Sequence, residues 1–215
     1  MSIRTLEHLS DYLSEDLAWR KKELSSLNTM IEWNKLNSSK TKSLIRGSVN
    51  LMYAHWEGFS KNASMAYIEF VSNRQLPFKE LKRNFLAIYV KKRFHEASSS
   101  KKIHAFNEIV DFFLDDLNSK SNLPKSGVIN TRSNLSSEVL REMIKVLGLD
   151  YTPFLTKENL IDIKLLKRRN SIAHGEYLDL DEEEYEQLFR NIILLMDEFR
   201  NQVDNSAYLE TYKVA

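Results

Sequence analysis

The 215-residue sequence contains no cysteine, which excludes disulfide frameworks, thiolate metal sites and thiol nucleophiles and fits a reducing compartment. Glycine and proline are also scarce, with five and three residues, which is about 4% of the chain against an average of about 12%. Sandwiches and barrels need turn residues at short intervals, so this shortage argues against an all-β fold.

Long apolar runs are missing as well. No run approaches the roughly 20 residues that a membrane-spanning helix needs, and the first residues are charged, without the apolar stretch of a signal peptide. With 42% hydrophobic and 28% charged residues, the composition is not that of a disordered chain. The sequence predicts a soluble cytoplasmic protein that does not contact the membrane.

The chain has almost no net charge, since 31 basic and 30 acidic side chains give +1. The segments, however, differ strongly. Residues 79–102 carry eight basic and two acidic side chains, residues 157–170 carry five and two, and residues 176–198 carry one and nine. This distribution argues against indiscriminate coating of nucleic acid and favours a confined basic cleft with acidic shoulders.

Helical periodicity runs through almost the whole sequence and predicts an all-α bundle of about six or seven helices, read as a single domain over residues 1–215. Capping residues predict that helices end at Gly148 and at Gly175. They also predict that a helix starts at Asp181, which is spaced for reciprocal capping with Glu184. A short hairpin near residues 128–129 stays open. The predicted helices cover residues 1–36, 43–73, 78–96, 103–117, 139–147 and 156–173, and a last helix begins after Asp181.

Common phosphate and metal motifs are absent. There is no glycine-rich phosphate loop, and the five histidines never form the pair of a zinc protease helix. The acidic run from Asp179 to Glu184 lacks the glycine of a calcium loop, and a helix cap at Asp181 explains it better. No metal and no cofactor is expected.

One segment, from Lys167 to Glu176, combines cations, an amide and an imidazole. Asn170 and His174 lie four residues apart and share a helix face, and Arg169 is long enough to reach toward them. An imidazole that titrates near neutrality beside a guanidinium suits acid–base work on a phosphodiester. A basic helix end is also ordinary helix chemistry, so spacing alone leaves a structural role open.

The string R-N-S-I-A-H-G at residues 169–175 resembles the signature of the HEPN superfamily, an arginine followed by a polar residue and then a histidine. Two further strings, L-M-Y-A-H-W-E-G-F at residues 51–59 and N-T-R-S-N-L at residues 130–135, resemble segments of a bacterial HEPN group called MAE-like. The match in order and spacing runs from about residue 40 to the C-terminus.

The resemblance implies a HEPN-like helical bundle that is a metal-independent endoribonuclease. In such enzymes the RNA 2′-oxygen attacks the adjacent phosphorus and leaves a 2′,3′-cyclic phosphate. His174 would then move protons, Arg169 would stabilise charge on the phosphoryl oxygens, and Asn170 would orient the phosphate or the imidazole. The implied partners are RNA, a second copy that completes the cleft, and an antitoxin or other defence protein, for a toxin or a phage-defence effector.

Several other residues have two readings. His55 and Glu57 are either a second shell of the cleft or the edge of the core. Basic residues near the motif and in the third helix either bind RNA or form solvated faces; these are Lys167, Arg168, Lys91, Lys92 and Arg93.

The function also has an alternative, a catalytically inactive HEPN-like module that binds a partner protein or a nucleotide. The long N-terminal helix favours such an interaction role. For a homodimer, the apolar stripes of the second and last helices are the expected contact surfaces.

Overall fold

The computed structural model describes residues 2–34, 38–100, 102–131 and 134–214. Over these residues the protein is all-α, with two isolated β-bridges and no strand, so the predicted fold class is confirmed and residues 128–129 form no hairpin. None of the described helices has the length and apolar character to cross a bilayer. The α-helices are α1 (Leu6–Trp33), α2 (Ser38–Asn73), α3 (Arg83–Ser100), α4 (Asn107–Leu114), α5 (Ser137–Leu147), α6 (Arg168–Ala173) and α7 (Glu182–Tyr208).

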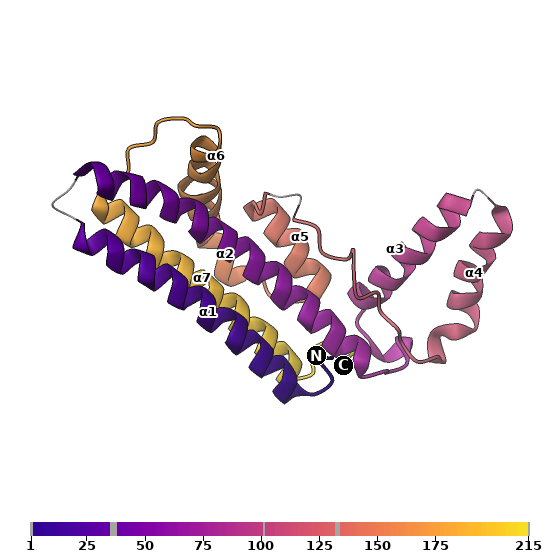
Figure 1. The fold of residues 1–215 in the computed structure, drawn as a ribbon. Coiled ribbons are helices and arrows are strands. Elements are labelled where there is room, and N and C mark those ends of the chain that lie inside the picture. Colours follow the sequence, from indigo (N-terminus) through magenta and orange to yellow (C-terminus); the bar gives the residue numbers. More distant parts are fainter. Residues whose placement is uncertain (1, 35–37, 101, 132–133, 215) are drawn as a thin grey trace.

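Helices α1, α2 and α7 lie side by side and form the body of the molecule (Figure 1). Their apolar stripes meet in one core, in which Trp56 of α2 packs edge-on against Phe199 of α7 with ring centroids 6.2 Å apart. Because the stripes of α2 and α7 are buried inside the chain, the prediction that they form a dimer surface is wrong.

The predicted start of α7 and the predicted end of α5 are confirmed. The Asp181 side chain accepts the Glu184 N–H at 2.8 Å and starts α7, and Gly148 ends α5 with a φ of 70°. The reciprocal half of the Asp181 cap is wrong, because the Glu184 carboxylate forms an ion pair with Arg168 in place of a hydrogen bond to the start of the helix. Helix α2 starts at Ser38, five residues earlier than the pattern predicted.

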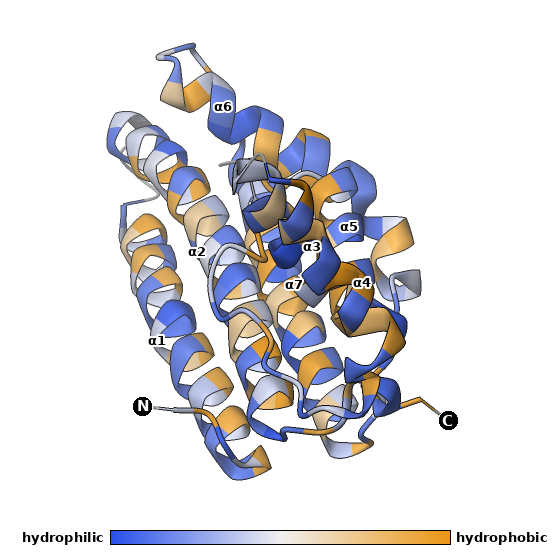
Figure 2. Cartoon of the chain, turned by 90° about the vertical axis from the view of Figure 1, so that its right-hand side faces the viewer, coloured by the Kyte–Doolittle hydropathy of each residue, from blue (hydrophilic) through white to orange (hydrophobic). Residues whose placement is uncertain are grey.

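The region from residue 78 to residue 118 differs most from the prediction. Phe78–Glu80 forms a separate short turn, so α3 begins at Arg83, and it continues to Ser100, beyond the predicted end at residue 96. The next predicted helix is divided into 3-10 turns at Ile103–Phe106 and Asp116–Asn118 and the shorter α4 between them. Helices α3 and α4 project from the body as an arm (Figure 1), and Figure 2 shows apolar residues along α4.

Candidate functional site

The helix that carries the Arg–Asn–His motif widens just before it. Residues 158–173 form one helical run, in which Leu160–Lys167 is π-helical and α6 returns to the α-helical pattern. The four leucine and isoleucine side chains on its inner face, Leu160, Ile161, Leu165 and Leu166, are buried, while Ile163 is exposed. Residues 168–170 are partly exposed. Such wide turns are rare and often lie at functional sites. Here the wide turn keeps its apolar face in the core and brings the motif to the surface.

Helix α6 ends in a Schellman turn around Gly175. The φ of Gly175 is 77°, a conformation that glycine adopts without the steric cost that other residues carry. Its N–H donates to the Ile172 carbonyl at 3.1 Å, and the Glu176 N–H donates to the Ser171 carbonyl at 2.9 Å. The predicted stop at Gly175 is therefore confirmed. His174, the last residue before this turn, presents an exposed side chain at the helix C-terminus.

Arg169 is held by side chains from two distant segments. Its guanidinium carbon lies 3.9 Å from the centroid of the Tyr53 ring of α2, a cation–π contact, and its Nη2 donates to Asn134 Oδ1 at 3.3 Å. The Tyr53 hydroxyl accepts the Leu135 N–H at 2.7 Å. Burial raises the pKa of Tyr53, although the Leu135 N–H and the Arg169 side chain oppose the rise. These contacts fix the direction of the guanidinium.

The remaining motif residues surround Arg169 on α6. Asn170 is half-buried one turn before His174, and Lys167 is exposed. Arg168 turns toward α7, where its Nη2 lies 2.9 Å from Glu184 Oε1. Arg169 and Asn170 thus lie on α6, His174 is its C-cap, and Arg168 forms an ion pair at its edge.

The acidic loop that follows α6 is tied to α2. Arg46 Nη2 donates to the Glu176 carbonyl at 2.9 Å, and Lys42 Nζ lies 2.9 Å from Asp179 Oδ1. The acidic run predicted as a shoulder of the cleft therefore borders the motif directly. The negative charges of this loop repel a polyanion that approaches His174 from that side.

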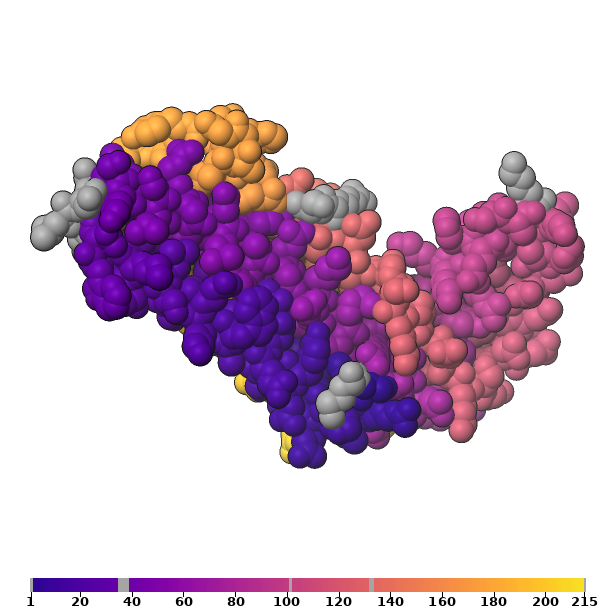
Figure 3. Space-filling model, viewed as in Figure 1, coloured from indigo at the N-terminus to yellow at the C-terminus, as the bar shows by residue number. Residues whose placement is uncertain are grey.

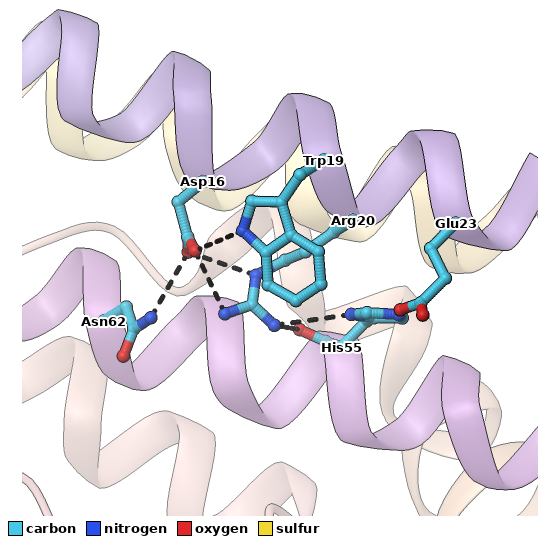
Figure 4. Close-up of polar contacts among 6 residues, drawn as sticks. All are labelled: Asp16, Trp19, Arg20, Glu23, His55 and Asn62. Carbon is cyan, nitrogen blue, oxygen red and sulfur yellow. Dashed lines mark hydrogen bonds and ion pairs between the residues drawn. The ribbon is translucent and has the colours of Figure 1, made fainter.

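His55 and Tyr53 are two residues apart on α2 and so point to opposite sides of the helix. His55 is buried against α1, where its Nε2 lies 2.7 Å from Glu23 Oε2 and its Nδ1 lies 3.4 Å from Arg20 Nη1 (Figure 4). Burial lowers the pKa of His55. His55 thus belongs to the α1–α2 contact, on the side away from Arg169.

Arg20 is the centre of this contact and is buried. Its Nε and Nη2 lie 3.1 Å from the two carboxylate oxygens of Asp16, which also accepts hydrogen bonds from Trp19 and Asn62 (Figure 4). Gly58 leaves room for the guanidinium, since a Cβ there would lie 2.8 Å from Arg20 Nη1. Two residues of the A-H-W-E-G-F string therefore have a structural role beside this buried arginine, since His55 contacts it and Gly58 leaves space for it.

Glu57 lies on the other side of α2, one turn after Tyr53. It is half-buried, and its charge contributes to the raised pKa of Tyr53. Of the two residues considered for a second shell, the structure therefore brings Glu57 toward the Tyr53–Arg169 contact and places His55 elsewhere.

The basic residues of α3 lie on the arm. Arg93 donates to the Tyr89 hydroxyl at 3.0 Å and lies 2.7 Å from Glu108 of α4, so it holds the arm together. Lys91 and Lys92 are exposed and line a groove between the arm and the body. Lys101, Arg132 and Ser133 lie outside the described residues.

Sequence reasoning missed Tyr53, Asn134 and Arg20 as residues with polar roles. Tyr53 and Asn134 each stand in a string that resembles the family, which was the available signal. The signal for Arg20 was its place as an isolated cation on the apolar stripe of the first helix, between Leu17 and Leu24. Over the part of the chain that the structure describes, no cluster of histidine and acidic side chains could hold a metal ion.

An all-α bundle with an Arg–Asn–His motif at the end of a surface helix is the arrangement expected of a HEPN domain. A family model described as MAE_28990-like HEPN matches residues 9–212. The chain belongs to this family. The match begins inside α1, whereas the strings noted in the sequence began near residue 40. No curated protein matches the chain, and no solved structure does.

Proposed function

We propose that this HEPN domain is a metal-independent endoribonuclease with Arg169, Asn170 and His174 as its catalytic residues. The observation that carries the proposal is the end of α6. There a guanidinium is fixed on the Tyr53 ring, and an imidazole is exposed at the Schellman turn five residues later. A fixed cation and a mobile proton carrier are what cleavage of a phosphodiester requires.

The proposed reaction forms a bond between the RNA 2′-oxygen and the adjacent phosphorus and breaks the bond from phosphorus to the 5′-oxygen. The imidazole of His174 takes the proton of the 2′-hydroxyl or supplies the proton that the leaving 5′-oxygen needs. Arg169 stabilises the charge that grows on the phosphoryl oxygens, and Asn170 orients the phosphate. Because the 2′-hydroxyl is the nucleophile, the substrate is RNA and not DNA.

One imidazole cannot readily be acid and base in the same step. A second copy that brings its own His174 to the same phosphate would supply the other role, so we expect the active form to be a homodimer. The exposed position of His174 supports this, since the side chain is accessible to a second chain.

RNA would approach from the side of Lys167, since the opposite side of the motif is acidic. Residues 176–186 carry seven acidic side chains and no basic one, and they repel phosphates. This path involves the motif end of the molecule only; Lys91 and Lys92 line a separate groove between the arm and the body.

The test is cleavage of a fluorescent single-stranded RNA by the purified protein in the presence of EDTA, with the 3′ ends analysed for cyclic phosphate. We expect His174→Ala to lower the rate by about 10²–10⁴-fold. His8→Ala, a histidine of α1 near the opposite end of the body, is the matched control and should cleave like the parent.

Equal rates for His174→Ala and the parent would exclude this mechanism. An inactive parent that binds RNA or a partner protein stably would favour the alternative, a non-catalytic HEPN module. For the biological role we propose a toxin or a phage-defence effector. Growth arrest on expression of the parent, and normal growth with His174→Ala, is the expected result.

A further inference from the structure

A groove of about 570 Å³ separates the arm from the body (Figure 3). One wall is α3, and the other is formed by residues 124–128 and the end of α5. The walls combine aliphatic side chains with three lysines. The aliphatic residues are Ala87, Ile88, Val128 and Val146, and the lysines are Lys91, Lys92 and Lys145.

The chemistry of the lining argues for a peptide rather than for nucleobases. The lining contains no Phe, Tyr or Trp and a single imidazole, His95, whereas sites for single-stranded nucleic acid stack successive bases on several aromatic rings. Aliphatic walls with cations beside them suit an amphipathic helix that carries apolar side chains between carboxylates.

Helix α4 of the arm is such a segment. Its inner residue Phe112 packs on Tyr89 and Phe78, with ring centroids 4.9 Å from each, and this contact fixes α4 to its own α3. The stripe of Val110, Phe113 and Leu114, by contrast, faces solvent, and Leu114 is 74% exposed. Three exposed carboxylates accompany the stripe: Asp111, Asp115 and Asp116.

We propose that α4 of one chain docks into the arm–body groove of a second copy, and that the exchange is reciprocal. Both halves of the contact are present in one sequence, and they are complementary in polarity and charge. A two-fold dimer requires this self-complementarity, because each residue of the interface is used by both copies. The cations of the groove have at most surface ion pairs, such as Lys92 with Glu96 at 3.8 Å and Lys145 with Glu142 at 3.1 Å, which exchange at little cost.

The groove in which α4 would dock is formed in part by the segment that leads to Arg169. Val128 lines the groove, and six residues further along the same segment Asn134 holds Arg169. Six residues span at most about 20 Å. A helix docked in the groove therefore rests on the segment that positions Arg169. The interface itself does not depend on the proposed ribonuclease activity, and the experiments below measure association alone.

The absence of cysteine makes a direct test possible. Leu114→Cys and Ser126→Cys are prepared as separate single-cysteine chains, mixed, and treated with a short bismaleimide. We expect a covalent heterodimer of the two chains, because Ser126 lines the groove into which Leu114 docks. Leu194→Cys replaces Leu114→Cys in the control, since Leu194 is a similarly exposed leucine of α7, and this pair should give at most background.

A second test uses charge and mixing. The arm variant Asp111→Lys/Asp115→Lys and the groove variant Lys91→Glu/Lys92→Glu should each be monomeric by light scattering at micromolar concentration, while the parent is a dimer. Mixing them should restore dimers, because the native arm of one fits the native groove of the other and the reversed charges pair in the second contact. Leu194→Asp should leave the dimer unchanged. Circular dichroism confirms that each variant is folded.

Three results would overturn the proposal. The first is a monomeric parent. The second is a parent dimer that both variants retain, which would place the interface elsewhere. The third is a pair of monomeric variants that do not complement each other. If the parent is monomeric and Lys91→Glu/Lys92→Glu weakens binding to a single-stranded RNA, the groove belongs to the RNA path.

Discussion

Helix α2 contacts an arginine of another helix on each of two sides, Arg20 of α1 and Arg169 of α6, and the two contacts differ in kind. On the side of α1, Arg20 is 6% exposed and lies 3.1 Å from both oxygens of Asp16. On the side of α6, Arg169 stacks on the ring of Tyr53 and donates to the amide of Asn134.

The difference is the one expected between a structural cation and a cation that, as we propose, acts on a phosphate. The Asp16 carboxylate of the same helix neutralises the buried guanidinium of Arg20. Hydrogen bonds from Arg20 to the His55 carbonyl and from Asn62 to Asp16 then join α1 to α2. An aromatic face and an amide orient a guanidinium without neutralising it, so its field remains available to an approaching phosphate. We therefore expect changes on the Arg20 side to affect folding and changes on the Arg169 side to affect activity.

The largest effect is expected for Arg20→Ala. Its removal leaves the Asp16 carboxylate, which is 11% exposed, without its cation, and breaking a largely buried pair in this way costs about 3–5 kcal/mol of unfolding free energy. Urea denaturation measures this loss. Arg190→Ala is the matched control, since Arg190 is 65% exposed in its pair with Glu186, and such surface pairs contribute about 0–1 kcal/mol. Equal losses for the two variants would contradict a structural role for Arg20.

The next effect is on activity. Arg169→Lys keeps the charge but loses the planar guanidinium that stacks on Tyr53 and donates to Asn134. We expect RNA cleavage to fall about 10²-fold with little change in stability. Arg168→Lys is the control, because its ion pair with Glu184 can form with an ammonium. If Arg169→Lys instead lowers stability and leaves cleavage intact, Arg169 has the role that we assign to Arg20.

Much of the fold follows from the sequence, because long helices with one buried stripe leave a regular pattern. The stripe of α2, the stop at Gly175 and the cap at Asp181 are examples, since each depends on residues that are neighbours in the chain. The arm departs from the prediction for a physical reason. The stripe with Val110 and Leu114 has the same spacing as a core stripe, and periodicity does not tell whether a partner helix covers it.

The sequence also predicts part of the candidate site, namely the residues that are neighbours in the chain. The motif residues stand together in the sequence, and the HEPN resemblance pointed to them directly. Tyr53 and Asn134 are 116 and 35 residues away from Arg169, and only the packing of α2 and the segment before α5 brings them together. The assignment of His55 to α1 likewise required the helix arrangement.

A smaller effect on stability is expected for alanine substitutions at two glycines of α2, and the two substitutions should have opposite signs. Gly58→Ala places a Cβ 2.8 Å from Arg20 Nη1, and because Asp16 holds that guanidinium we expect a loss of about 1–2 kcal/mol from overpacking. Gly47→Ala meets no atom within 4 Å, so it should stabilise the helix by about 0.5–1 kcal/mol. Thermal unfolding of both variants measures the opposite signs. Stabilisation by Gly58→Ala would show that the Arg20 side chain is not fixed by its partners.

The smallest effect is a pH dependence on the α1 side. Burial lowers the pKa of His55, with Arg20 adding to the shift and Glu23 opposing it. In the unfolded chain the imidazole has its ordinary pKa of about 6.5, so the unfolded state binds the proton first as the pH falls. The free energy of unfolding should therefore decrease below about pH 6.5, down to the pKa of the folded state.

The variant His55→Gln does not titrate at residue 55 and should lose this part of the slope when unfolding is measured in urea from pH 7 to pH 5. His104→Gln serves as the control, since His104 is exposed on the arm and no buried arginine contacts it among the described residues. It should keep the parent slope. A His55→Gln variant with the full parent slope would assign the pH dependence to other groups, and the two sides of α2 would then differ only in how each arginine is held.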